Sequence, residues 1–154
     1  GRLILQENPS DLTAPIPVAG FRELNFGYYE GEDDVKTWHT IGGPIGINSF
    51  HGLIAEFGIS KAEDMIAAAD PYKDAESGET FWKRLKPAID KVVEDASDGD
   101  KILLATHGTL IRNVVDRWSD IPVNVSTKNG SVTKVNFDDG RYSVEYFNNV
   151  SEDL

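Results

Sequence analysis

Residues 101–112, KILLATHGTLIR, combine the signal of a buried strand with that of a helix that follows it directly. The apolar run at 101–106 has the length and continuity typical of a strand covered on both faces of a parallel sheet. Over 109–118 the apolar spacing predicts a helix. His107 and Gly108 therefore fall at the carboxyl end of the strand, which is where open α/β sheets bind their ligands.

Further elements are predicted on both sides of this segment. The longest helical pattern covers 79–96, where apolar residues recur every three or four positions. Two shorter helices are predicted before it, in NSFHGLIAEFG and SKAEDMIAAAD, the second with Ser60 as its N-cap and Glu63 completing a capping box. Alternation in SVTKVNF and YSVEYF predicts a hairpin at the end of the chain. Strand and helices in this order indicate an α/β fold.

Composition and charge limit the classes of partner. The 154 residues, 40% hydrophobic and 27% charged, fit one globular domain over 1–154. No apolar run approaches the ~20 residues that span a bilayer, and no secretory leader is recognisable, so cytoplasm is the default location. A net charge of −11 repels nucleic acid and anionic membranes, so we expect neither as a partner. The chain has no cysteine, which excludes disulfides and thiolate chemistry.

His107 has two interpretations. Free N–H groups in the first turn of a helix bind anions, and Gly108 allows a ligand to approach the backbone closely, so a phosphate oxygen fits beside the imidazole. The alternative is that His107 only hydrogen-bonds a neighbouring carbonyl and has no chemical role.

The segment FRELNFGYYEG, residues 21–31, predicts a structured loop that carries Glu23 and Glu30 among aromatic rings. A carboxyl group partly desolvated by such rings can act as a general acid near neutral pH. The alternative is a solvated acidic loop without function. Only closeness to His107 in space would make the loop part of a site.

Taken in order, FRELNFGYYEG, AESGETFWKRL and LLATHGTLIR, followed by a terminal hairpin, resemble the histidine phosphatase superfamily, the phosphoglycerate mutase-like proteins. The resemblance covers nearly the whole chain. It implies an α/β fold of three layers, with a mostly parallel sheet and helices on both faces, and chemistry without a metal or other cofactor. Ala75 and Thr80 are small departures from residues that are common in the family.

The resemblance also assigns roles to residues. The loop motif supplies the proton donor and base of the family, and this role falls on Glu23. The second catalytic histidine of the family falls on His107. Glu76, Ser77 and Arg84 match the motif that begins the helix before that histidine. The substrate-binding residues expected beside them are Asn25, Phe26, Gly108 and Thr109.

One departure from the family is large. The family's reaction needs an Arg-His-Gly motif after a first strand, whose histidine is phosphorylated, and a further arginine that grips the phosphate. Neither motif occurs in these 154 residues, so we expect the first strand to be missing from the chain. Arg2 does not replace the arginine, because chain ends are usually loose. His51, in SFHGLI, and His39, beside Trp38, are predicted on a helix surface or lid.

The resemblance implies phosphoryl transfer through a phosphohistidine on a small phosphorylated substrate. A lid-like insert at about 32–71 favours a phosphatase of small phosphate monoesters over a phosphoglycerate mutase-like enzyme. Without the nucleophile, the chain alone is predicted to be inactive. A missing first strand would also leave an unpaired edge beside 101–106, which favours a homodimer.

Two alternatives stay open. The first is a non-catalytic anion-binding or regulatory module that retains half the pocket, with Glu23 and His107. The second is a metallohydrolase that uses these two residues and His51. The sequence disfavours it because no two ligands have the close spacing of known metal motifs, so no metal is expected.

Overall fold

The computed structural model describes residues 14–151, and all statements below refer to these residues. Arg2 lies outside them. The elements, in chain order, are η1 Ala19–Phe21, η2 Gly27–Tyr29, α2 Asp34–Ile41, η3 Gly43–Ile45, α3 Phe50–Phe57, α4 Ile59–Ala69, α5 Gly78–Asp95, α6 Gly108–Trp118, β1 Val132–Asp138 and β2 Arg141–Asn149.

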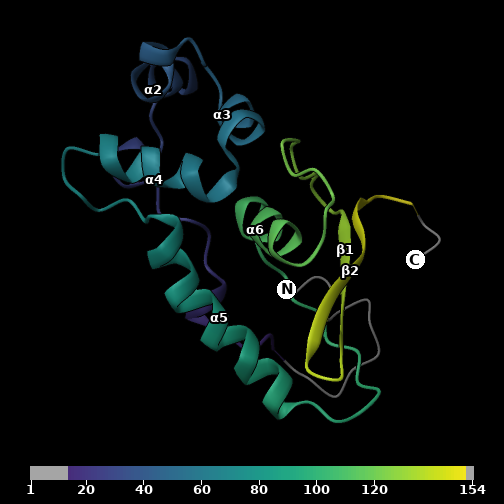
Figure 1. Ribbon diagram of the computed structural model, residues 1–154. Helices are drawn as coiled ribbons and strands as arrows, with labels where there is room; N and C mark the ends of the chain where they lie inside the picture. The colour runs from purple at the N-terminus through teal and green to yellow at the C-terminus, as the bar shows by residue number, and fades with distance from the viewer. Residues whose placement is uncertain (1–13, 152–154) are drawn as a thin grey trace.

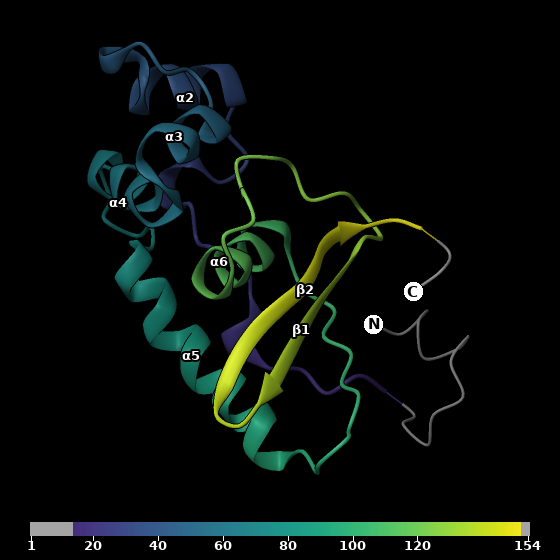
Figure 2. The same cartoon turned by 45° about the vertical axis from the view of Figure 1, so that its right-hand side comes forward.

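Helix α6 is the centre of this arrangement. In both ribbon views it lies between α5 and the β1–β2 hairpin, while α2, α3 and α4 gather at one end of the molecule (Figures 1 and 2). Two buried apolar clusters meet on it, because its adjacent faces enter different clusters. The first cluster includes Leu53, Ile54, Ile59, Ile66 and Val115. The second includes Phe21, Phe81, Leu85, Leu110 and Val114.

The predicted helices are confirmed, with one error at a boundary. Helices α3, α5 and α6 agree with the predicted segments to within a few residues. Helix α4, however, begins at Ile59 with Gly58 as its N-cap and without a side-chain cap, so the capping box of Ser60 and Glu63 is wrong. Gly58, with a φ of 81°, turns the chain sharply out of α3, and α4 begins at once. The side chain of Glu63 is buried instead.

The predicted hairpin is confirmed. β1 and β2 pair antiparallel up to Asp138 and Arg141. Asp139 and Gly140 connect them with φ angles of 46° and 76°, as a two-residue turn of type I′ requires. The ring of Tyr142 stacks on Trp118 at 4.0 Å between centroids and so holds the hairpin against α6.

The buried strand predicted over 101–106 is not formed among the described residues. The backbone there belongs to no strand, and the β1–β2 hairpin is the single sheet within 14–151. Ile102, Leu103 and Leu104 are 52%, 60% and 44% exposed. An extended run becomes a strand only beside another strand that pairs with its N–H and C=O groups, and the described part of the chain offers none. The parallel sheet expected around this run is therefore not seen in residues 14–151.

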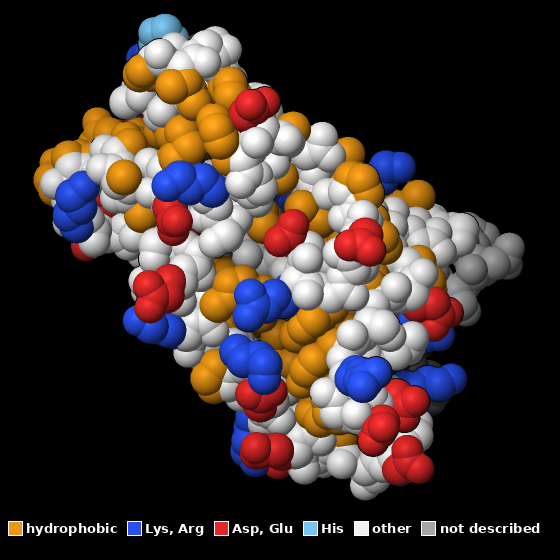
Figure 3. Space-filling view, viewed as in Figure 1, with side chains coloured by type: hydrophobic (Ala, Val, Ile, Leu, Met, Phe, Trp, Pro, Cys, Tyr) orange, Lys and Arg blue, Asp and Glu red, His pale blue; other side chains and the backbone are white. Residues whose placement is uncertain are grey.

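The insert predicted as a lid, about 32–71, contains α2, α3 and α4. Its inner side chains belong to the first apolar cluster. Apolar side chains also gather on the surface at this end of the molecule (Figure 3). Within the insert, Val35, Ile45 and Phe57 are exposed. That the insert acts as a lid stays a prediction. Within residues 14–151, no helix is both long and apolar enough to cross a bilayer.

Candidate active site

The structure brings Glu23 to the first turn of α6. Glu23 Oε2 accepts the N–H of Thr109 at 3.0 Å, and Oε1 accepts those of Leu110 at 3.1 Å and Leu24 at 3.0 Å. His107 is the N-cap residue of α6, but its side chain makes no capping hydrogen bond and is exposed. The carboxylate from the loop therefore caps the helix. The two residues predicted to be catalytic lie at the same helix end.

This contact has a consequence for the predicted anion site. The Thr109 and Leu110 N–H groups, which a phosphate would use, are donated to Glu23. Gly108 is fixed through its carbonyl, which accepts the Thr127 hydroxyl at 3.3 Å. An anion that approaches the start of α6 thus meets the Glu23 carboxylate first. The substrate-binding roles of Gly108 and Thr109 stay predictions.

Arg84 on α5 holds the loop that carries Glu23. Its Nε and Nη2 donate to the two carboxylate oxygens of Glu76 at 2.6 and 2.7 Å. Its Nη1 also donates to the carbonyls of Gly20 and Arg22 at 2.9 and 3.0 Å, and its Nη2 to that of Glu23 at 2.7 Å. A planar guanidinium forms such a fan of bonds because its N–H groups have fixed directions. Arg84 therefore fixes the backbone at Glu23 itself.

Glu76 joins this clamp from the other side. Its Oε2 accepts the N–H of Asn25 at 2.9 Å, and its N–H donates to the Asn25 carbonyl at the same distance. Burial opposes the charge of Glu76, but the hydrogen bonds from Arg84 and Asn25 outweigh it and hold the pKa of this carboxyl below its usual value. Ser77 next to it caps α5 by accepting the N–H of Thr80 at 3.2 Å. Ser77 therefore caps the start of α5, and Glu76 beside it fixes the loop that carries Glu23.

The other predicted loop residues lie beside Glu23. Asn25 is exposed, and its side chain accepts the Gly27 N–H at 2.9 Å and donates to the Asp74 carbonyl at 3.0 Å. Phe26 meets Phe50 edge to face, with centroids 6.1 Å apart. Glu30 accepts the Phe26 N–H at 2.9 Å, which gives it a structural partner within the loop. Substrate binding by Asn25 and Phe26 stays a prediction.

The remaining histidines lie on the insert. His39 is exposed on α2. His51 is half-buried on α3, with Nε2 3.2 Å from the hydroxyl of Ser126, and burial together with nearby Arg112 lowers the pKa of its imidazole. Residues 14–151 contain no cluster of three or more His, Asp and Glu side chains able to hold a metal ion. The metallohydrolase alternative thus gains no site from the described residues.

A buried polar group beneath the first turn of α6 was missed by the sequence interpretation. Asn113 Nδ2 donates to Glu63 Oε1 at 2.6 Å and to the Thr109 carbonyl at 3.0 Å. Arg112 Nη2 donates to the Thr109 hydroxyl at 3.1 Å, and its guanidinium lies 4.9 Å from the centre of the Phe50 ring. These three side chains, Glu63, Arg112 and Asn113, are called the polar cluster below. They surround the residue whose N–H binds Glu23.

A signal for part of the cluster was present in the sequence. Glu63 falls in the same helical stripe as Ile59, Ala62 and Ile66, which are all buried in α4. A charged residue inside an apolar stripe indicates a buried polar contact, because burial without a partner is costly. The position of its partner on α6, fifty residues later, had no local signal.

Burial dominates the electrostatics of the polar cluster. It raises the pKa of Glu63 to about 7, although the hydrogen bond from Asn113 and the charge of Arg112 act in the opposite direction. Burial also lowers the pKa of Arg112. Among the described residues, Glu63 Oε2 and the Nε and Nη1 atoms of Arg112 have no hydrogen-bond partner. Glu63 therefore changes charge close to neutral pH.

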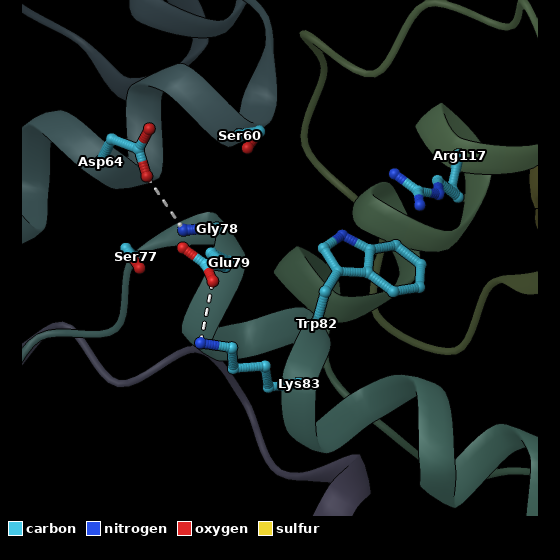
Figure 4. A pocket seen from close by; sticks show the side chains of 8 residues that line it. All are labelled: Ser60, Asp64, Ser77, Gly78, Glu79, Trp82, Lys83 and Arg117. Atoms are coloured by element: carbon cyan, nitrogen blue, oxygen red, sulfur yellow. Dashed lines mark hydrogen bonds and ion pairs between the residues drawn. The ribbon is translucent and has the colours of Figure 1, made fainter.

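A separate groove of about 730 Å³ opens where α4, the start of α5 and the end of α6 meet (Figure 4). Its charged groups have partners: Lys83 pairs with Glu79 at 2.8 Å, and Asp64 accepts the Gly78 N–H at 3.2 Å. Arg117 lies over the ring of Trp82. Neither Glu23 nor His107 lines this groove, so it is distinct from the candidate active site.

Comparisons relate this architecture to known proteins. The family model of the histidine phosphatase superfamily (branch 1) matches residues 51–150. The crystal structure of phosphoglycerate mutase from Bacillus anthracis str. Sterne matches with a TM-score of 0.74 and 37% sequence identity, over 84% of this chain and 57% of that chain. Among curated proteins, no match was found. The predicted phosphoglycerate mutase-like α/β fold class is confirmed by the structural match.

The raised pKa of Glu63 predicts a pH-dependent difference in stability between the wild type and Glu63→Gln. Its folded pKa, about 7, lies above the ordinary 4.5, so its contribution is full below pH 4.5 and is lost as the pH rises through 7. In urea denaturation, the wild-type free energy of unfolding should fall by about 3 kcal/mol relative to Glu63→Gln between acidic and alkaline pH. A difference that does not change with pH would contradict this account.

Proposed function

The chain belongs to the histidine phosphatase superfamily, and from this premise we propose that its function is phosphoryl transfer through a phosphohistidine. The observation that supports it best is the Glu23 carboxylate bound to the first turn of α6, at the helix end where His107 is the N-cap residue. An acid and an imidazole at one helix N-terminus suit a reaction in which charge develops on phosphoryl oxygens.

The proposed reaction has two steps. A histidine nitrogen attacks phosphorus, the bond from phosphorus to the leaving oxygen breaks, and that oxygen takes the proton of the Glu23 carboxyl group. His107, at the start of α6, stabilises the charge that develops on the phosphoryl oxygens. Glu23 then accepts a proton from water as the water attacks phosphorus and the bond from phosphorus to nitrogen breaks. The attacking histidine belongs to the Arg-His-Gly motif, which residues 1–154 do not contain.

For substrate, we propose small phosphate monoesters and a phosphatase reaction. The short helices α2, α3 and α4 of the insert support a variable cover over the site rather than a dedicated clamp. The alternative is mutase chemistry, in which a second hydroxyl of the substrate replaces water. The match to a phosphoglycerate mutase at 37% identity favours that alternative. A cytoplasmic location, with neither nucleic acid nor membrane as partner, completes the proposal and agrees with the net charge of −11.

The 154-residue chain alone should bind inorganic phosphate without hydrolysing 4-nitrophenyl phosphate. Binding is expected at the exposed His107 imidazole, since the Thr109 and Leu110 N–H groups are donated to Glu23. Turnover is not expected, because the nucleophile motif is absent. Phosphate titration by NMR should perturb His107, and His107→Ala should abolish binding. His39→Ala, at an exposed position on α2, is the matched control and should bind normally.

The outcomes test the assigned site and the predicted inactivity. Binding without turnover supports a retained half of the pocket, which is also what an anion-binding module would show. Turnover that Glu23→Gln abolishes would contradict the predicted inactivity and support the catalytic role of Glu23. Absence of both binding and turnover would contradict the assigned site.

We also propose that the uncovered run at 101–105 favours a homodimer. Its apolar side chains are exposed, and its backbone pairs with no strand in the described part of the chain. Sedimentation equilibrium should detect a dimer at high protein concentration, and Leu103→Glu should weaken it. Val35→Glu, at a more exposed apolar position on α2, should not. A wild-type protein that stays monomeric at high concentration would contradict the proposal.

A further inference from the structure

The polar cluster connects the insert to the candidate active site. Glu63 comes from α4, and its Oε1 accepts the side-chain amide of Asn113 on α6 at 2.6 Å. Both side chains are buried, with exposed fractions of 0% and 1%. A hydrogen bond this short between buried groups, one of them a carboxyl, fixes both side chains, because neither can exchange its partner for water.

The contact continues into the first turn of α6. Asn113 Nδ2 also donates to the carbonyl of Thr109 at 3.0 Å. The N–H of Thr109 in turn donates to Glu23 Oε2 at 3.0 Å. Four residues thus form one path of hydrogen bonds, from α4 through Asn113 and Thr109 to the proposed proton donor.

Arg112 supports the same turn from a second direction. Its Nη2 donates to the Thr109 hydroxyl at 3.1 Å, and its guanidinium packs on Phe50 of α3. The Thr109 backbone and side chain are therefore both held by the polar cluster. Glu63 is the single member of the polar cluster that comes from outside α6, so it links α4 to the first turn of α6.

We propose that Glu63 is a positioning residue for the site: by fixing Asn113 it sets the place of Thr109, and through Thr109 the place of the Glu23 carboxyl group. The proposal rests on the proposed function for its catalytic meaning, but the contacts that carry it do not depend on that function. Helix α4 would then position the site in addition to packing in the apolar core. The buried carboxyl group of Glu63 would then fix the position of the Glu23 carboxyl group relative to the insert.

The ionisation of Glu63 offers a signature of this path. The charged groups that act on it are Arg112 and Asp116 from α6 and Asp64 from α4 itself. Helix α5 faces it with Gly78, where a Cβ atom would lie 3.2 Å from Glu63 Oε2. Since burial raises the pKa of Glu63 to about 7, its charge changes within an accessible pH range. The NMR signals of Asn113 and Thr109 should therefore change as Glu63 ionises.

The test is a pH titration of the 154-residue protein by ¹H–¹⁵N NMR. The side-chain amide of Asn113 and the backbone amide of Thr109 should shift with a common midpoint near 7. Because imidazoles titrate in the same range, the reference is Glu63→Gln, which retains every histidine and removes only this titration. The shared shift of the Asn113 and Thr109 amides should disappear in Glu63→Gln. If the Thr109 amide titrates identically in both proteins, the proposal is overturned.

A second pair of variants tests the position itself. Glu63→Met removes the acceptor at similar volume, and amide exchange at Thr109 should become about tenfold faster, as expected for one lost hydrogen bond. Glu63→Gln keeps an oxygen acceptor and should restore slow exchange. Unchanged exchange at Leu85 and Ile89 of α5 shows that the fold is intact. Equal exchange at Thr109 in the wild type and Glu63→Met would overturn the proposal.

The experiments distinguish failure of the proposed function from failure of the positioning proposal. If phosphate neither binds nor reacts while the Thr109 resonance follows Glu63, the positioning is supported and the phosphoryl-transfer assignment fails. If phosphate binds at His107 while Thr109 ignores Glu63, the reverse holds. Should Glu63→Met not fold, the titration of the wild type against Glu63→Gln decides alone.

Discussion

The structure depends on the pairing of Arg84 with Glu76. One guanidinium satisfies both oxygens of a buried carboxylate and three backbone carbonyls of the loop before Leu24. That loop has no regular hydrogen-bond ladder, so its carbonyls need partners from elsewhere. Because Arg84 supplies them from the rigid helix α5, the loop has one conformation. This conformation delivers Glu23 to α6.

Helix α6 is contacted by side chains from several other elements. Glu23 reaches its first turn from the loop, Glu63 contacts it from α4, and Tyr142 stacks on its last residue, Trp118, from the hairpin. The two apolar clusters meet on its adjacent faces. A helix surrounded in this way holds the candidate site rigidly, as a site that must orient an acid and an imidazole requires.

Local signals in the sequence predicted much of this. Apolar spacing predicted α3, α5 and α6, and the alternation of apolar and polar residues predicted the hairpin, because each pattern depends on neighbours in the chain. The motif resemblance identified the family and singled out Glu23, His107 and Arg84. The predictions that were wrong concern residues whose structure depends on partners distant in the sequence. The run at 101–106 needs another strand to become one, and Glu63 was assigned to a cap because its partner Asn113 lies on another helix.

The most direct measurement of the central claim is amide exchange at Thr109 and Leu110 in Arg84→Lys, compared with Lys83→Ala. Lysine keeps the charge but cannot reach Glu76 and the three carbonyls together. Arg84 makes five hydrogen bonds and an ammonium has only three donors, so at least two bonds to a charged group are lost. Each contributes about 1.5–3 kcal/mol, so the loop should release Glu23 and exchange should become at least about 100-fold faster. Exposed Lys83→Ala should leave it unchanged. If both amides stay as protected in Arg84→Lys as in the wild type, the clamp does not place Glu23, and the account is wrong.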